Sequence, residues 1–123
     1  MTTSTSTPAL VRRYKQGALL PSLTVQWYDG PAQNAALVAF GSIAHTWSLK
    51  ISKYGNTKAL VTKTTGITGA DTAPNVTIDW SAGEIDTLAP GEYSVQLVGT
   101  RTSDSKPRFC PQEIRIIIDP VMT

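Results

Sequence analysis

The chain has 123 residues, of which 41% are hydrophobic and 16% are charged, and it carries a formal net charge of +2, one cysteine and one histidine. This length fits a single domain that folds around its own core. One cysteine excludes an internal disulfide, and one cysteine with one histidine argues against a zinc site, which usually has four such ligands. The small net charge and the lack of an apolar run of roughly 20 residues argue against nucleic acid or a membrane as a partner, and we expect no metal and no cofactor.

The chain begins with a polar segment that leads into a short basic cluster. Residues 1–8 read MTTSTSTP, lack the apolar stretch of a secretory signal peptide, and are too polar to bury much surface. The basic cluster consists of Val11, Arg12, Arg13, Tyr14 and Lys15. Two interpretations stay open for it: a docking arm that meets an acidic surface on a neighbouring subunit, or an exposed edge strand with Arg and Lys as gatekeepers. We expect residues 1–16 to be a flexible arm and residues 17–123 to be one β-sandwich domain.

Short runs of alternating apolar and polar residues, separated by turns, make up the rest of the chain. A period of two is typical of strands with one buried face. The expected strands cover residues 23–28, 45–51, 59–62, 76–80, 92–98 and 108–119, with a loop over residues 64–74. For residues 32–40 a short helix is possible, but we favour an extended connection. The pattern predicts an all-β fold: a single immunoglobulin-like antiparallel β-sandwich of about seven strands.

A tyrosine just after a Pro-Gly turn refines this prediction. Pro90 and Gly91 lead into Tyr93 at the start of a strong strand. In immunoglobulin-type sandwiches a tyrosine at this place folds back and hydrogen-bonds the backbone of the preceding corner. We predict the same contact for Tyr93. The Cys-Trp-Cys pattern of antibody domains is absent from the sequence.

The aromatic residues divide into two groups according to the alternation. Those on expected inward faces, which we assign to the core, are Trp27, Trp47, Trp80 and Tyr93. Those expected to be exposed and available to a protein interface are Tyr14, Tyr28 and Tyr54. A carbohydrate-binding platform needs aromatic side chains on an outward face, which the three tryptophans do not provide in this assignment.

The candidates for catalysis lack the partners that catalysis needs. His45 has neither a nucleophile nor an orienting carboxylate nearby in sequence. Cys110 lies close to Arg108, which could lower the thiol pKa, but a lone strand cysteine is more often a small hydrophobic residue. Glu84 and Asp86 fit an acidic turn better than a glycosidase pair. No phosphate-binding glycine motif occurs. We therefore expect that the protein is not an enzyme.

One further motif, Asn75-Val76-Thr77, fits the acceptor pattern for N-glycosylation. Because no secretory signal precedes it, we interpret this match as chance.

Several segments together resemble a family of phage virion proteins. The segment Leu20-Pro21-Ser22-Leu23-Thr24-Val25-Gln26-Trp27-Tyr28-Asp29-Gly30 looks like the start of the N-terminal β-sandwich of phage baseplate upper proteins. Segments similar to the second half of that domain are Val76–Ser81, Ala89–Tyr93 and Lys106–Pro111 through Ile114–Ile116. The same sandwich recurs in tail-tip collar proteins that anchor side fibres on long-tailed phages. The resemblance covers roughly residues 17–120.

This resemblance implies a virion structural protein of a tailed phage, assembled in the host bacterial cytoplasm. It favours a tail-tip, collar or baseplate adaptor subunit that links tail and fibres by protein–protein contacts. The fibre-bearing region in which baseplate upper proteins usually continue is absent here, so we expect a stand-alone subunit. A capsid decoration protein and a carbohydrate-binding module are the alternatives.

The expected partners are further copies of the chain and other phage virion proteins, namely tail tube, distal tail, fibre or capsid proteins. The candidate interface residues are Val11, Arg12, Arg13, Tyr14, Lys15, Leu37, Val38, Phe40, Arg108 and Arg115.

Overall fold

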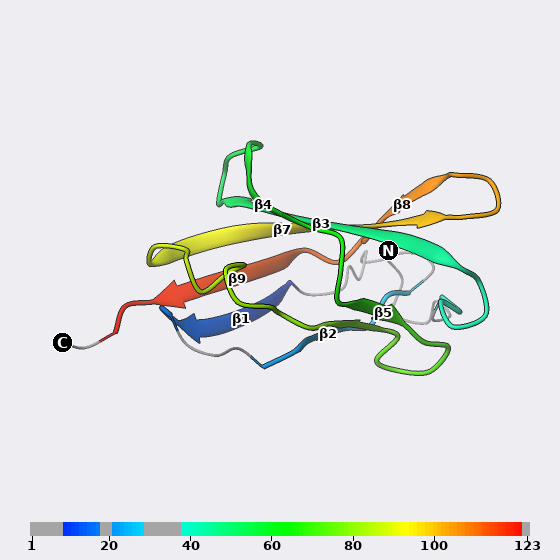
Figure 1. Ribbon diagram of the computed structural model, residues 1–123, viewed down its shortest axis with the longest axis horizontal. Coiled ribbons are helices and arrows are strands. Elements are labelled where there is room, and N and C mark those ends of the chain that lie inside the picture. The colour runs from blue at the N-terminus through cyan, green and yellow to red at the C-terminus, as the bar shows by residue number, and fades with distance from the viewer. Residues whose placement is uncertain (1–8, 18–20, 29–37, 122–123) are drawn as a thin grey trace, which may run out of the picture.

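A computed structural model describes residues 9–17, 21–28 and 38–121, and within these ranges the protein is all-β without a helix. The strands form two sheets that pack face to face as a β-sandwich (Figure 1). The predicted all-β sandwich is thereby confirmed. No helix in the described ranges has the length and apolar character needed to cross a membrane.

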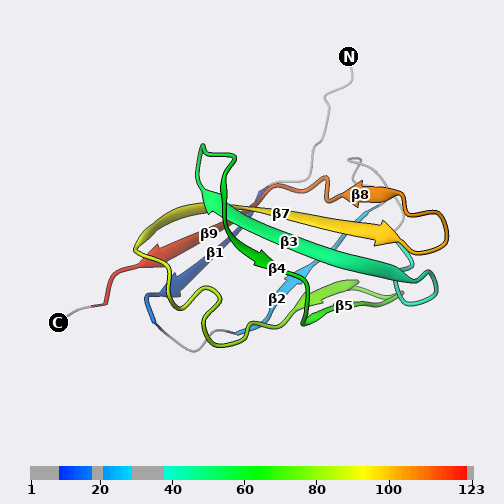
Figure 2. The same ribbon diagram turned by 45° about the horizontal axis from the view of Figure 1, so that its top comes forward.

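Nine strands are present in the described residues. They are β1 (Leu10–Lys15), β2 (Leu23–Val25), β3 (His45–Lys53), β4 (Ala59–Lys63), β5 (Ile67–Gly69), β6 (Val76–Ile78), β7 (Gly91–Arg101), β8 (Pro107–Phe109) and β9 (Ile114–Asp119). The six-stranded sheet has the order β1-β9-β7-β3-β4, with β8 also paired to β7, and the three-stranded sheet has the order β2-β6-β5 (Figure 2). Every pair is antiparallel except β1 with β9, which is parallel.

The strand order follows the immunoglobulin scheme. In that scheme strands B, E and D lie in one sheet, and G, F, C and C′ lie in the other. Here β2, β6 and β5 correspond to B, E and D, while β9, β7, β3 and β4 correspond to G, F, C and C′. β8 and β9 pair with the two ends of β7, so they are two parts of one interrupted strand.

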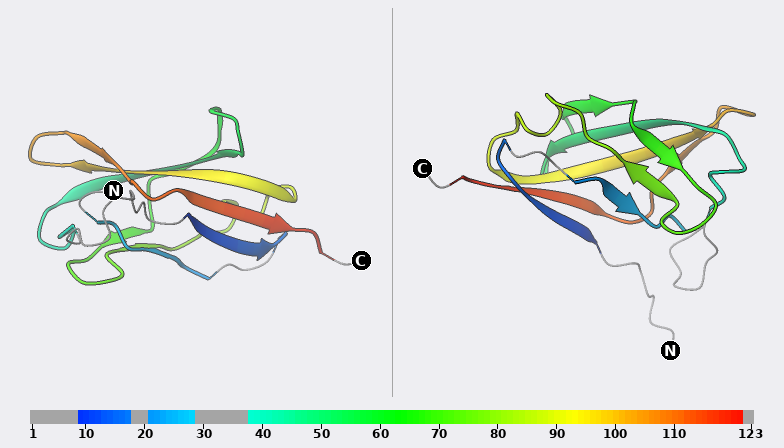
Figure 3. Two further views of the ribbon diagram at one scale, coloured as in Figure 1. Left: turned by 180° about the vertical axis from the view of Figure 1, so that it is seen from behind. Right: turned by 60° about the horizontal axis from the view of Figure 1, so that its bottom comes forward.

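Two segments differ from the expectations. Residues 10–15, which we placed in a flexible arm, form β1 and lie beside β9 (Figure 3), so they are an edge strand of the six-stranded sheet. Residues 1–8 of the expected arm lie outside the described residues. The expected loop over residues 64–74 contains β5, a strand of three residues that pairs with β6. Most of the connection over residues 32–40 also lies outside the described ranges.

The core fills the space between the sheets and comes from alternating positions, as the pattern predicts. In β9, Ile114, Ile116 and Ile118 are buried, and the residues between them are more exposed. The Tyr93 hydroxyl donates a hydrogen bond to the Ala89 carbonyl at 2.6 Å, which confirms the predicted tyrosine corner. Trp47 of β3 is only half-buried and covers Gly99, where a Cβ would come within 2.9 Å of the indole.

A buried asparagine joins the end of the β2 segment to the chain that follows it. The Asn75 side chain is 0% exposed. Its Oδ1 accepts a hydrogen bond from the Trp27 backbone N–H at 2.7 Å, and its Nδ2 donates to the carbonyls of Trp27 at 2.8 Å and Val38 at 3.0 Å. All of these contacts lie in the interior, so Asn75 is not accessible to a glycosylating enzyme in this fold. The structure agrees with the chance interpretation of that motif.

Candidate interface site

The β1 strand has one free edge. The Leu10 N–H donates to the Glu113 carbonyl at 2.7 Å, and the Gln16 N–H donates to the Asp119 carbonyl at 2.8 Å. Even-numbered residues therefore direct their main-chain groups toward β9, and the odd-numbered residues of β1 direct theirs away from it. No described strand pairs on that side. β1 thus offers an unpaired row of N–H and C=O groups, which is the usual template for adding a strand.

Of the five candidate interface residues on β1, all except Tyr14 have exposed side chains. Val11 is 40% exposed, and Arg12 and Lys15 are also exposed. Arg13 is exposed but engaged, because its guanidinium binds both carboxylate oxygens of Asp119 on β9 at 3.0 and 3.2 Å. These residues give the edge a basic character.

Tyr14 is the exception, and the prediction that it is exposed is wrong. Its parallel pairing places it opposite Ile118 on the inner face of the sheet, where it is 6% exposed. Burial raises the pKa of the Tyr14 hydroxyl above its ordinary value. Tyr14 therefore anchors β1 to the core and does not contribute to a docking surface.

The prediction that Leu37, Val38 and Phe40 contribute to an interface is also corrected. Leu37 lies outside the described residues, while Val38 and Phe40 are each only 5% exposed. The Phe40 ring packs edge-to-face against Trp27 and Trp47, with centroid distances of 5.0 and 4.8 Å. Val38 and Phe40 are core residues, which their apolar character in an apparent loop did not reveal.

The two remaining candidates are half-buried arginines on the six-stranded sheet. Arg108 belongs to β8, beside Gly99 of β7. Arg115 of β9 forms an ion pair with Glu113 at 2.9 Å, and its guanidinium covers the ring of Tyr54 at 4.6 Å from the centroid. Tyr54 is exposed, as predicted, but Arg115 covers one face of its ring. Arg115, Glu113 and Tyr54 therefore form one cluster beside Ser94 of β7, whereas Arg108 lies near the other end of that strand.

The outer face of the six-stranded sheet was not recognised from the sequence. It carries a shallow groove of about 220 Å³ between β3, β4 and β7. The lining residues are Lys50, Ser52, Asn56, Thr57, Ala59, Ser94, Val95 and Gln96. Phe109, 60% exposed, lies farther along this face because it pairs with Val98 of β7. Alternation along β7 predicts that its polar residues lie on the outer face. That Phe109 lies on the same face follows only from the pairing of β8 with β7.

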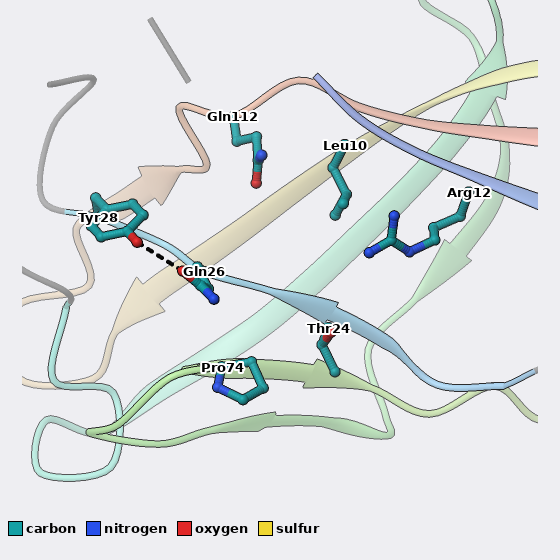
Figure 4. A pocket seen from close by; sticks show the side chains of 7 residues that line it. All are labelled: Leu10, Arg12, Thr24, Gln26, Tyr28, Pro74 and Gln112. Carbon is teal, nitrogen blue, oxygen red and sulfur yellow. Dashed lines mark hydrogen bonds between the residues drawn. The ribbon is translucent and has the colours of Figure 1, made fainter. Parts of the chain in front are cut away.

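A second groove lies at the side of the sandwich between β1 and β2. Its volume is about 280 Å³, just below the 300 to 1,000 Å³ typical of small-molecule sites. The residues that line it are Leu10, Arg12, Thr24, Gln26, Tyr28, Pro74 and Gln112 (Figure 4). The Tyr28 hydroxyl is half-buried and donates to the Gln26 side-chain carbonyl at 2.7 Å. Polar side chains dominate the groove.

The two side chains considered as catalytic candidates, His45 and Cys110, make contacts that serve the fold. His45 Nδ1 lies 2.8 Å from the Ile43 carbonyl, and its ring packs against Phe40 at a centroid distance of 4.8 Å. Cys110 is half-buried, and burial raises the pKa of its thiol, which is opposite to the lowering expected from a nearby arginine. Neither residue has the arrangement of an activated nucleophile or base.

The acidic turn supports the sandwich from inside. Both Glu84 oxygens accept hydrogen bonds from Lys63 Nζ, at 2.7 and 2.8 Å, and the Lys63 side chain is fully buried. Asp86 accepts a hydrogen bond from the Gly83 N–H at 2.8 Å. In the described part of the chain, no three His, Cys, Asp or Glu side chains gather as a metal site would require.

The chain matches no protein-family model and no curated protein. A functional interpretation therefore depends on the surfaces described above and on the sequence segments that resemble phage proteins.

Proposed function

We propose that this chain is a structural protein of a tailed-phage virion, a tail-tip, collar or baseplate adaptor subunit that links tail and fibres by protein–protein contacts. The observation that carries the docking role is the free edge of β1, with Val11, Arg12 and Lys15 exposed on a strand held firmly to β9. Main-chain pairing at such an edge provides affinity, and the flanking side chains provide register. The phage assignment comes from the resemblance of the segments at residues 20–30, 76–81 and 106–116.

The outer face of the six-stranded sheet supports a role in protein contacts. Protein interfaces have cores that are poor in charge and enriched in aromatic side chains. Lys50 is the charged residue that lines the groove on this face, whose other lining residues are uncharged, while Phe109 and Tyr54 lie exposed near it. A carbohydrate-binding module is less well supported, because Trp27 is buried and Arg115 covers the Tyr54 ring.

The proposal is tested by locating the protein in its source particle with cryo-electron microscopy. We expect a ring or collar of copies at the tail that contacts a neighbour through β1. Density on the head shell would instead identify a capsid decoration protein. Absence from the purified particle would refute a virion role altogether.

A variant links that location to the β1 edge. Val11→Pro removes a main-chain N–H that points away from β9, so the pairing with β9 stays intact. We expect normal folding but reduced incorporation into particles. Val11→Ala is the matched control, because it shortens the same side chain and keeps the N–H. Equal incorporation of Val11→Pro and wild type would refute docking through this edge.

A further inference from the structure

The β2 strand also has a free edge, and the hydrogen bonds around β6 show which residues form it. The Ala70 N–H donates to the Asn75 carbonyl at 2.9 Å and the Asp79 N–H donates to the Gly66 carbonyl at 2.8 Å, so odd-numbered residues of the β6 segment face β5. The even-numbered residues Val76 and Ile78 consequently face β2, where they pair with Val25 and Leu23. On the β2 segment, the residues that alternate with Leu23 and Val25 consequently direct their main-chain groups away from β6.

Thr24 and Gln26 therefore direct their N–H and C=O groups outward. Their side chains line the groove between β1 and β2, and no strand of the described chain pairs with them. From the other sheet, β1 directs its own free edge away from β9 and extends Leu10 and Arg12 into the same groove (Figure 4). Two open sheet edges thus border one groove.

The strand that precedes β2 in the chain, β1, pairs with β9 of the other sheet and not with β2. An immunoglobulin-type sandwich carries a strand A next to B, in a sheet of order A-B-E-D. The three-stranded sheet here supplies B, E and D as β2, β6 and β5, with no strand beside β2 among the described residues. The groove is smaller than a typical small-molecule site, but it is bordered by main-chain donors and acceptors that an extended peptide can pair with.

Charge indicates what such a peptide carries. Arg12 is the charged residue among those that line the groove. Its guanidinium donates to the neighbouring Val11 carbonyl at 3.1 Å, and no ion pair with a described carboxylate is formed by it. Arg12 is exposed, so its charge is open to a carboxylate from outside. Gln26 and Thr24 supply uncharged polar contacts on the opposite wall.

We propose that the groove between β1 and β2 binds an extended segment of another protein chain, which adds to β2 as a fourth strand and places an acidic side chain against Arg12. Thr24 and Gln26 pair with the main chain of that segment. This inference deepens the proposed docking function and rests on it, because it adds the edge of β2 as a second docking edge and gives the chemistry of the partner. It predicts that binding depends on both backbone pairing and charge.

The test titrates isotope-labelled protein with two synthetic peptides, TVTETVT and TVTKTVT, and follows backbone amides by NMR. We expect the glutamate peptide to shift the amide signals of Thr24 and Gln26 and to slow their hydrogen exchange, with the lysine peptide at least tenfold weaker. No shift at these amides at about 2 mM glutamate peptide, a concentration at which even millimolar binding is visible, would overturn the proposal. Equal affinity for the two peptides would also overturn it.

Three variants separate backbone pairing from charge. Arg12→Glu reverses the preference between the two peptides, whereas Lys58→Glu in the exposed β3–β4 turn changes the net charge equally and leaves the preference unchanged. Thr24→Pro removes an outward N–H, keeps the pairing with β6, and abolishes binding of both peptides. If Thr24→Pro retains its thermal transition and still binds, strand addition at β2 is refuted.

The two proposals fail in different ways. A particle reconstruction that shows the protein docked in the tail with this groove empty refutes the groove and leaves the virion role standing. Peptide binding in the groove by a protein that is absent from the particle refutes the virion role and leaves the groove standing.

Discussion

Replacement of Asn75 by alanine tests how much the buried Asn75 side chain, which joins Trp27 to Val38, stabilises the fold. Its side chain makes three hydrogen bonds, to the N–H and carbonyl of Trp27 and to the carbonyl of Val38, and it is 0% exposed. Asn75→Ala leaves the Trp27 carbonyl one partner, because the Val38 N–H also donates to it at 3.0 Å. The Val38 carbonyl likewise keeps one partner, the Phe40 N–H at 3.0 Å, so the Trp27 N–H is the group left without the partner that Asn75 gave it. A buried polar group without a partner costs about 1 to 3 kcal/mol.

We expect Asn75→Ala to lower the free energy of unfolding by about 2 to 4 kcal/mol, from the orphaned Trp27 N–H, the two other lost hydrogen bonds and the small cavity. That is a large share of the roughly 5 to 15 kcal/mol that stabilises a small domain. Urea denaturation followed by tryptophan fluorescence measures it, because Trp27 lies in the affected region. Asn56→Ala, in the exposed β3–β4 turn, is the control. A decrease in the free energy of unfolding of less than about 1 kcal/mol for Asn75→Ala would refute this account of the Asn75 hydrogen bonds.

Three further predictions concern the charged and titratable groups. Glu84→Ala leaves the buried ammonium of Lys63 without its carboxylate and should lower the free energy of unfolding, measured by urea denaturation, by about 3 to 5 kcal/mol. Lys63→Met removes the charge and keeps the length of the side chain, so it should lower the free energy of unfolding clearly less. Equal decreases for the two variants would contradict this reasoning. Hydrogen bonds from Ser42 lower the pKa of Asp71, and hydrogen bonds from Arg101 lower the pKa of Asp104 to about 2. Both carboxylates therefore stabilise the fold above their unfolded pKa of 3.8, and this stabilisation is lost as the pH falls through the folded pKa of each. Thermal unfolding between pH 5 and pH 2 should therefore show a shallower loss for Asp104→Asn than for wild type, and identical slopes would exclude a contribution from this pair. Because burial raises the pKa of Cys110, its reaction with iodoacetamide at pH 8 should be slower than that of a free thiol peptide, and a faster reaction would show an activated cysteine.

Local sequence patterns predicted much of the core. Alternation placed Leu23, Val25 and Ile116 correctly, because the side-chain period of a strand is a local property of the backbone. The tyrosine corner was also accessible, since Tyr93 and the turn that it contacts are only four residues apart. Patterns of this kind need no knowledge of which strands pair.

What the sequence could not supply were the consequences of distant pairing. Tyr14 lies in a basic cluster that favours exposure, and only its pairing with Ile118 turns it inward. Phe40 stands at the end of the expected connection over residues 32–40, and its burial depends on contacts with Trp27 and Trp47. The groove between β1 and β2 combines residues from separate segments, so no local pattern marks it.

The parallel pairing of β1 with β9 also determines how the domain responds to tension. Leu10 lies opposite Ile114 and Lys15 opposite Asp119, so the chain enters the sheet at one end and leaves it at the other. A pull applied at those two points acts along both strands and in opposite directions. The evenly spaced hydrogen bonds between the strands are then loaded together in shear, rather than opened one after another as in a zipper. The sandwich therefore has the strand geometry of a link that transmits force along its length.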